Sequence, residues 1–468
     1  MAEEAPLEQL LFLQEVLEVN KMSNDLLSII DSFIAKAEKL GADEVELYAL
    51  SQKKKTVNFE SNNLKSAVAT NSEGVGIRVL KNKALGFASI NTFDKKKIAE
   101  GLKEAFAIAK VSPPEDNYHL PNKKPISKVA SIFDEAISTV SMDDVIAYSN
   151  KLLQKARAFD SRVSVDSGTF DATESYYAIV NSNGISASDQ KSSLNYGLIG
   201  MAIDGDDIGS FDYEFDTVIN VADVNVEKTA VDFSKKVLQS LGSKKIEAFE
   251  GPAIFTPDAA QLLFGLIVEG AKATNIQSGS SYLQDKLGDK IAVDAVTLVD
   301  NGTMKNTPGS RSFDREGVPH KKLNIVENGT FTGVLYDTFT ANKEGLESTG
   351  HAAGGFRNIP QLGTTNLKIT PGKKSIDDII PEIKKGVIIQ RISTFPDPVS
   401  GDYSGPVKGG RLIENGEITD SLKEITVVGN VFADLKAITH ISKEIKPYRG
   451  TPSWFVPYVA VDKLKFVS

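Results

Sequence analysis

The chain has 468 residues and a formal net charge of −9, and 41% of its residues are hydrophobic and 25% charged. This length exceeds what one hydrophobic core supports and predicts two or three domains, while the lack of an apolar run of about 18 residues argues against a membrane-spanning helix. The sequence contains no cysteine, which excludes disulfides, thiolate zinc ligands and thiol nucleophiles and fits a cytoplasmic location.

The sign of the charge bears on the class of partner. Phosphate binding requires clustered positive charge, so the negative balance argues against a nucleic-acid partner. The densest basic runs are Lys53–Lys55 and Lys95–Lys97, and we interpret both as solvated faces, which is the usual role of short lysine runs.

Residues 1–21 are expected to be an acidic N-terminal extension, with five glutamates against one lysine. The segment has neither the basic start nor the small-residue cleavage site of a secretory signal. Its leucines can share one side of a short amphipathic helix. It is either an artefact of an upstream start or a docking helix, and we expect it to be dispensable for function.

Residues 22–245 are predicted to form an N-terminal α+β lobe in which helix, antiparallel strands and helix occur twice, over 22–112 and 140–245. Residues 111–138 between them are predicted to be a linker or long loop, because a proline pair interrupts the chain there. The helices expected from apolar spacing are Leu26–Leu40, Asp94–Lys110, Met142–Ala158 and Val226–Leu241. The strands expected are Glu44–Leu50, Thr56–Glu60, Leu64–Thr70, Gly74–Leu80, Ala84–Ile90, Val163–Gly168, Glu174–Asn181, Gly184–Ser188, Ser193–Asp204 and Ile208–Val218, with a turn at Asn71-Ser72-Glu73-Gly74.

Residues 246–468 are predicted to form a C-terminal lobe of mainly antiparallel β-sheet with one buried helix. Asn-Gly pairs mark tight hairpins, since both residues accept positive φ, and they occur at 301–302, 328–329 and 415–416. A shorter helix, Ile376–Lys385, is expected before a strand at Gly386–Ile392.

The buried helix begins at Thr256-Pro257-Asp258, where a hydroxyl cap, a proline and an acidic residue form a helix start. Residues 259–273 are apolar on most of the helix circumference. One polar stripe interrupts this pattern at a spacing of i, i+4, i+8 and i+11, and it consists of Gln261, Gly265, Glu269 and Lys272. A zinc site built from histidine and cysteine is not expected there, because the stripe has neither.

Several motifs of the C-terminal half occur in an order that is more specific than any one of them. They are Phe313-Asp314-Arg315-Glu316-Gly317-Val318-Pro319, Ser348-Thr349-Gly350-His351-Ala352-Ala353-Gly354-Gly355, Val399-Ser400-Gly401-Asp402-Tyr403-Ser404, Leu412-Ile413-Glu414-Asn415-Gly416-Glu417-Ile418 and Glu424-Ile425-Thr426-Val427-Val428-Gly429-Asn430. In these motifs and their order the chain resembles the TldD/PmbA family, whose members were historically labelled modulators of DNA gyrase. Within that family it resembles the PmbA (TldE) branch. The resemblance covers residues 25–468 and is strongest from Gly251 onward.

The resemblance implies a cytoplasmic peptidase system in which TldD-type subunits hold zinc through a His-Glu-x-x-x-His helix and a late cysteine, and pair with PmbA-type subunits. Here Phe264, Gly265 and Glu269 occupy the three zinc-motif positions, and no cysteine is present near residues 447–450. We therefore expect no metal, no cofactor and no catalytic residue in this chain itself.

Two functions from different classes follow. The first is a non-catalytic partner of a TldD-like zinc-binding subunit, in a complex that degrades or processes unfolded peptides. The alternative is a non-enzymatic homodimer that binds peptides without a TldD partner.

The candidates for lining a peptide channel are Gln261, Glu269, His351, Asp402 and Tyr403. For Glu269 we favour the simpler interpretation, a carboxylate paired with a neighbouring lysine or arginine. His351 is either in a loop shaped for a ligand or hydrogen-bonded to backbone within a turn. Asp402-Tyr403-Ser404 lacks the G-x-S-x-G pattern of a serine nucleophile.

Other polar residues are given structural interpretations. Asp314, Arg315 and Glu316 are predicted to form a charged turn between strands. His119, His320 and His440 have no metal-ligand spacing. Gly265, which costs about 1 kcal/mol relative to alanine inside a helix, is explained either by close approach of another segment or by a crowded core.

Overall fold

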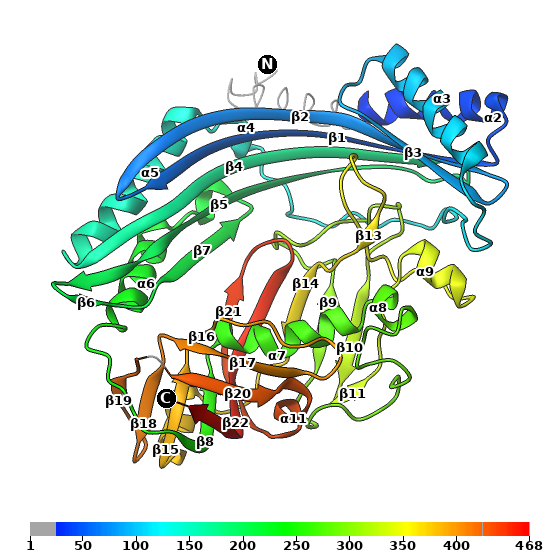
Figure 1. Cartoon of the computed structure of the whole chain (residues 1–468). Helices are drawn as coiled ribbons and strands as arrows, with labels where there is room; N and C mark the ends of the chain where they lie inside the picture. Colours follow the sequence, from blue (N-terminus) through cyan, green and yellow to red (C-terminus); the bar gives the residue numbers. More distant parts are fainter. Residues whose placement is uncertain (1–24, 424, 468) are drawn as a thin grey trace, which may run out of the picture.

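The computed structural model of the protein describes residues 25–423 and 425–467. Its N-terminal part is a long sheet that arches over a C-terminal lobe (Figure 1). The mixed α+β class is therefore confirmed. The acidic extension at residues 1–21 lies outside the described residues.

The arched sheet has seven antiparallel strands in the order β3-β2-β1-β4-β5-β6, with β7 paired to β5. Their bounds are β1 Glu44–Glu60, β2 Asn63–Lys81, β3 Ala84–Ile90, β4 Val163–Asn181, β5 Ser186–Asp204, β6 Asp207–Ile208 and β7 Asp212–Val218. The two expected units thus share one continuous sheet, because β1 pairs with β4 along most of its length.

In the structure, several pairs of short strands that the sequence predicted are each joined into one long strand. The run Lys53–Lys55 lies inside β1, where Lys54 pairs with Asp171 of β4 at 3.1 Å. The turn expected at residues 71–74 is wrong, since these residues lie in β2 and pair with β1. Gly74 has another role: a Cβ atom there would overlap the ring of Phe356 from the C-terminal lobe.

Helices pack at both ends of one face of this sheet. Residues 25–31 are helical, and α2 (Ile34–Leu40) ends at Gly41, whose φ is 92°. With α3 (Lys95–Val111) they cover Val45, Leu47 and Ala49 of β1. At the other end α5 (Met142–Phe159) and α6 (Val226–Leu238) cover Val57 and Phe59, which alternation places on the same face. The segment between α3 and α5 is irregular apart from the short α4 (Ala136–Thr139).

The C-terminal lobe contains a sheet of 13 strands in the described residues, mainly antiparallel, with parallel pairs β14–β22 and β8–β15. The strands are β8 Phe249–Phe255, β9 Leu298–Asn301, β10 Lys322–Glu327, β11 Thr330–Phe331, β14 Asn366–Ile369, β15 Lys385–Ile389, β16 Arg391–Ile392, β17 Asp402–Lys408, β18 Arg411–Glu414, β19 Glu417–Ser421, β20 Thr426–Asn430, β21 Ile438–Tyr448 and β22 Ser453–Val467; β12 Ala352–Ala353 and β13 Gln361–Leu362 form a separate pair. The helices are α7 Pro257–Gly270, α8 Ala273–Gln277, α9 Thr338–Lys343, α10 Ile376–Ile379 and α11 Val431–Lys436.

Two of the three Asn-Gly hairpins are confirmed. Asn328 and Gly329 have φ of 49° and 75°, and Asn415 and Gly416 have 52° and 83°. The third is wrong: β9 ends at Asn301, and its antiparallel partner β10 begins only at Lys322. The helix expected at residues 376–385 is also shorter, because a 3-10 turn at Ile380–Glu382 follows α10.

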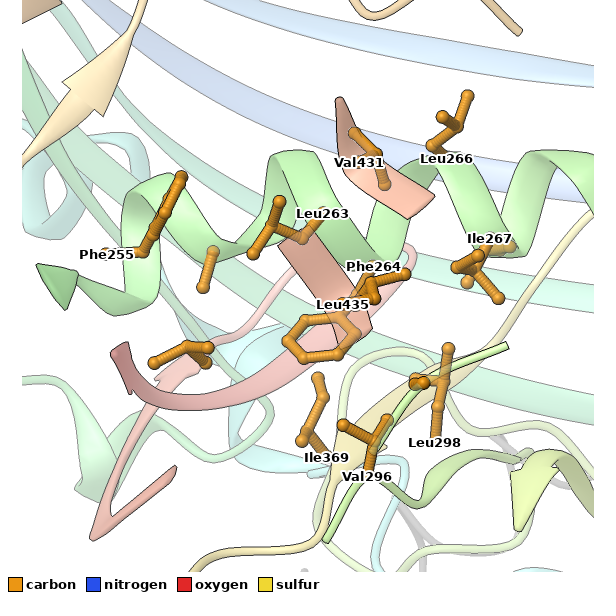
Figure 2. Close-up of a cluster of buried hydrophobic side chains, with 14 of the residues drawn as sticks. Phe255, Leu263, Phe264, Leu266, Ile267, Val296, Leu298, Ile369, Val431 and Leu435 are labelled. Atoms are coloured by element: carbon orange, nitrogen blue, oxygen red, sulfur yellow. The ribbon is translucent and has the colours of Figure 1, made fainter. Parts of the chain in front are cut away.

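Helix α7 lies across the large sheet and supplies much of its core. Thr256 caps it through its side chain, which accepts a hydrogen bond from Ala259 N. Leu263, Phe264 and Ile267 point into the hydrophobic cluster that β9, β14 and α11 complete (Figure 2). In the described part of the chain no helix combines the length and apolar character needed to cross a membrane.

A buried ionic network joins the two lobes. Glu46 of β1 accepts hydrogen bonds from Arg78 of β2 and from Nη1 of Arg315 at 2.8 Å, and Arg78 Nη1 donates to Glu316 Oε1 at 2.8 Å. All four side chains are at most 8% exposed. Residues 314–316 form the predicted turn, closed by the bond from Gly317 N to Asp314 O, and the structure adds that this turn is buried between the lobes.

A second cluster joins the lobes at the other end of the arch. Lys236 of α6 lies 2.6 Å from Glu214 of β7 and 2.8 Å from Asp258 at the start of α7. Lys446 of β21 lies 2.7 Å from the same Glu214. The arch is therefore held to the C-terminal lobe by two separate clusters of charge pairs, one of which includes the first turn of α7.

We predict that Glu46→Gln lowers the free energy of unfolding by about 3–5 kcal/mol, because it leaves two buried guanidinium groups with one carboxylate. Burial alone raises the pKa of Glu46, but the charges of Arg78 and Arg315 outweigh it and hold that pKa below its ordinary value. The stabilisation is therefore present above the ordinary carboxyl pKa and is lost as the pH falls. Urea unfolding at pH 7 and at pH 4 measures both effects.

The matched control is Glu60→Gln in the same strand, whose exposed carboxylate pairs, among the described residues, only with Lys65. It should leave the unfolding midpoint nearly unchanged. An equal, small effect of both substitutions would show that the network does not hold the lobes together.

Candidate functional site

A cleft of about 1140 Å³ lies on α7 between the lobes. Its floor is α7, and its other walls are the segment from β16 to Pro398, Trp454 of β22 and Tyr213 of β7. Segments from distant parts of the sequence thus meet along one face of a single helix.

The polar stripe of α7 faces this cleft, as its helical spacing predicts. Gln261, Gly265 and Glu269 all line it. Glu269 has a side chain 60% exposed, and both its oxygens lie 2.7–2.8 Å from Lys272 Nζ. The predicted pairing of Glu269 with a neighbouring lysine is therefore present in the structure.

Both explanations offered for Gly265 are wrong. A Cβ atom built on Gly265 would have no heavy atom within 4 Å, so neither a close segment nor a crowded core requires glycine. The missing side chain instead leaves the middle of the cleft floor open.

The opposite wall offers hydrogen-bonding groups and aromatic surface. Within the described part of the chain, the backbone N–H groups of Thr394 and Phe395 donate no hydrogen bond. The buried Nε of Arg391 also has no partner, although its Nη2 donates to Phe211 O at 2.8 Å. Phe395 is 96% exposed at the rim. Such a surface suits an extended chain with both polar and apolar groups.

The three positions matched to the family's zinc motif do not form a metal site. Phe264 is 1% exposed and points into the core, away from the cleft (Figure 2). Gly265 offers no donor, and Glu269 is paired with Lys272. No group of three or more His, Asp or Glu side chains in residues 25–423 and 425–467 is arranged to hold a metal ion. These residues therefore do not fit a bound zinc ion.

His351 lies in the interior and not on the cleft wall. It is 2% exposed, its Nδ1 is 2.7 Å from Thr349 Oγ1, and its Nε2 is 3.5 Å from Asp300 Oδ2. Asp300 also accepts from the backbone of Thr365 and Asn366. The order Thr–His–Asp is that of a hydrolase triad, but Thr349 Oγ1 accepts from Tyr336 N at 2.8 Å and donates to Tyr336 O at 3.1 Å, so the arrangement holds the loop in place.

The other histidines are dispersed, as their spacing suggests, with one exception. The rings of His320 and His351 are 6.4 Å apart. Burial, together with the charges of His351 and Arg311, lowers the pKa of His320 to about 3. His119 pairs with Glu44 and His440 with Glu382, far from each other in the fold.

Asp402 and Tyr403 also lie off the cleft. The Tyr403 hydroxyl donates to Asp434 at 2.8 Å, and its ring is 3% exposed. Asp402 is exposed and accepts from Asn430 Nδ2 at 2.7 Å. Of the five candidate residues, the structure brings together Gln261 and Glu269, and it adds a wall that no motif indicated.

Family models match most of the chain. The PmbA/TldA metallopeptidase domain 1 matches residues 45–109, the central domain 135–241 and the C-terminal domain 249–468. The cleft floor, the cleft's second wall and Phe264 all lie in the last of these.

Relatives and solved structures agree with these matches. A metalloprotease PmbA from Escherichia coli O157:H7 is 26% identical over 81% of this chain and 83% of its own length. A metalloprotease TldD homolog from Buchnera aphidicola is 24% identical over 93% of this chain and 92% of its own length. The crystal structure of TldE from Thermococcus kodakarensis has a TM-score of 0.87 at 24% identity and covers 94% of this chain and 100% of its own, which shows the same fold.

Replacing Phe264 or Gly265, which are neighbours in α7, by alanine should change the free energy of unfolding in opposite directions. Phe264→Ala should lower the free energy of unfolding by about 3–5 kcal/mol, because it empties part of the core. Gly265→Ala should raise it by about 0.5–1 kcal/mol, because the new methyl group meets no atom and the helix gains propensity.

Chemical denaturation of both variants measures this contrast. Circular dichroism of the folded variants is the control that α7 still forms. A destabilising Gly265→Ala would show that the cleft floor is not open.

Proposed function

We propose that this chain, which belongs to the TldD/PmbA metallopeptidase family, is the TldE/PmbA-like subunit of a TldD-type zinc metallopeptidase. In this proposal the complex degrades or processes unfolded peptides, and this chain supplies a wall of the peptide channel without holding zinc. The observation that supports it is the cleft on α7, whose floor has the open face of a peptide site but no metal-ligand set.

The cleft supports binding of an extended peptide. Such a peptide can accept hydrogen bonds from the free N–H groups of Thr394 and Phe395, as in strand addition, an interaction largely independent of side-chain identity. Gln261 offers an amide from the floor, and Trp454 and Phe395 offer apolar surface. An unfolded chain of mixed sequence matches this combination.

The catalytic groups are assigned to the partner. A zinc ion in the TldD-like subunit would polarise the scissile carbonyl and activate water. Residues of this chain would bind and orient the peptide beside it. With no cysteine in the sequence, we place the complex in the cytoplasm.

The isolated chain should contain well below one zinc per subunit by metal emission spectroscopy and should not cleave an unfolded peptide. Mixed with the TldD-like subunit of its own organism, it should form a heteromeric complex that contains zinc and cleaves the peptide. Size-exclusion chromatography with metal analysis of the same fractions measures both.

Stoichiometric zinc with EDTA-sensitive cleavage by the pure chain would refute the proposal. Recovery of only self-associated chain from the native host, with peptide bound, would favour the homodimeric binding protein instead.

Filling the cleft floor should separate peptide binding from assembly. Gly265→Trp projects a large ring into the cleft and should raise the KM of the complex for an unfolded peptide at least about tenfold, while Gly265→Ala should leave it nearly unchanged. Both variants should still assemble with the partner. Unchanged kinetics of the Gly265→Trp complex would show that peptides do not pass over α7.

A further inference from the structure

A second groove lies at the edge of the arched sheet, away from the α7 cleft. It has a volume of about 640 Å³ and runs along residues 186–190 at the start of β5. The loop before α4 forms one side with residues 123–128, and Phe313 of the C-terminal lobe and Leu27 of the first described helix complete it. Nothing in the proposed function uses this groove.

The groove has an open strand edge and an apolar lining. β4 pairs with β5 from Ser186 onward, but β7 covers the other edge only over Leu194–Gly200. In the described residues no strand covers that edge between 186 and 191. Pro125, Ile126 and Ala187 supply accessible apolar surface beside it, and such an uncovered edge is a surface that proteins usually protect.

The rim of the groove is basic. It carries Lys123, Lys124 and Lys128, with Asp189 as the one acidic residue of the lining. Lys128 pairs with Asp189 at 3.3 Å, and Lys124 with Glu347, whose side chain is 81% exposed. Lys123 has no ion pair among the residues that the structure describes. A ligand for this groove should therefore be apolar on one side and acidic on the other.

We propose that the N-terminal segment of this chain, residues 1–24, docks in this groove of its own molecule. The segment has this composition: eight leucine, valine and phenylalanine residues between 7 and 19, five glutamates and a single lysine. It also ends at the right place, because Asp25 begins the described chain and Leu27 already lines the groove. Its leucines contact Pro125, Ile126 and Ala187, and its glutamates face Lys123 and Lys124.

The chain has no native cysteine, so a pair of introduced cysteines reports proximity without background. In the full chain, Gln14→Cys with Ser186→Cys should form an intramolecular cross-link with a short bismaleimide reagent. The matched pair Gln14→Cys with Lys96→Cys, at an equally exposed residue of α3, should not. Adding Lys123→Glu and Lys124→Glu should slow the first cross-link about tenfold or more, while Lys95→Glu and Lys97→Glu should leave its rate unchanged.

Hydrogen exchange provides a second measurement on the full chain. Replacing Leu10, Leu13 and Leu17 by serine should speed amide exchange in residues 186–191 about tenfold, with no change in β4. A cross-link of dimer mass would show that the segment docks on another copy and would overturn the proposal. Equal cross-linking at Ser186 and Lys96, or unchanged exchange, would also overturn it.

Discussion

Glu46 has no contact with water, and its two partners reach it from different lobes. Arg78 comes from the neighbouring strand of the arch and Arg315 from a turn of the C-terminal lobe. Removing four charged side chains from water is costly unless each finds a partner of opposite charge, and here two acids and two arginines satisfy one another. Arg315 also donates to Gly355 O at 3.1 Å and lies 3.9 Å from the centre of the Tyr48 ring. A shift of one lobe against the other would separate these charges in a dry environment, so the network fixes their relative position.

The cleft depends on that constraint. Its walls come from both lobes, since Tyr213 lies in the arch while α7 and Trp454 lie below it. Lys236, Glu214, Asp258 and Lys446 hold the arch at the other end, and Asp258 is in the first turn of α7 itself. The helix that forms the cleft floor is therefore tied to the arch at its beginning and packed into the large sheet along its apolar face. An open cleft can persist in a folded protein because its two sides are fixed independently of what occupies it.

The sequence predicted helices and faces better than it predicted strand lengths. Helical caps and periodicity are local, so α3, α5 and α7 are capped by Asp94, Ser141 and Thr256 near the expected positions. The arched strands are different, because polar or glycine-containing stretches such as residues 71–74 look like turns in isolation. Their extended form is imposed by pairing with β1 and by the approach of the loop at Phe356, whose ring and backbone leave no room for a Cβ atom at Gly74 and Gly76. The sequence alone therefore does not distinguish a glycine needed for close approach between distant segments from a glycine needed for a turn.

The candidate site shows the same division between local and distant information. Helical spacing alone indicated that Gln261, Gly265 and Glu269 share a face, and Lys272 lies within reach of Glu269 one turn later. The second wall could not be derived in this way, because Arg391, Phe395 and Trp454 reach the cleft only through the order of strands in the large sheet. The charged residues 314–316 were likewise predicted only as a turn between strands, and the contacts that they make across the lobes were not, although they lie between Phe313 and Val318, both of which are buried. Apolar residues on both sides of an acid–base–acid sequence were the available signal that this turn is buried, and a buried turn of that composition requires opposite charges from elsewhere in the chain.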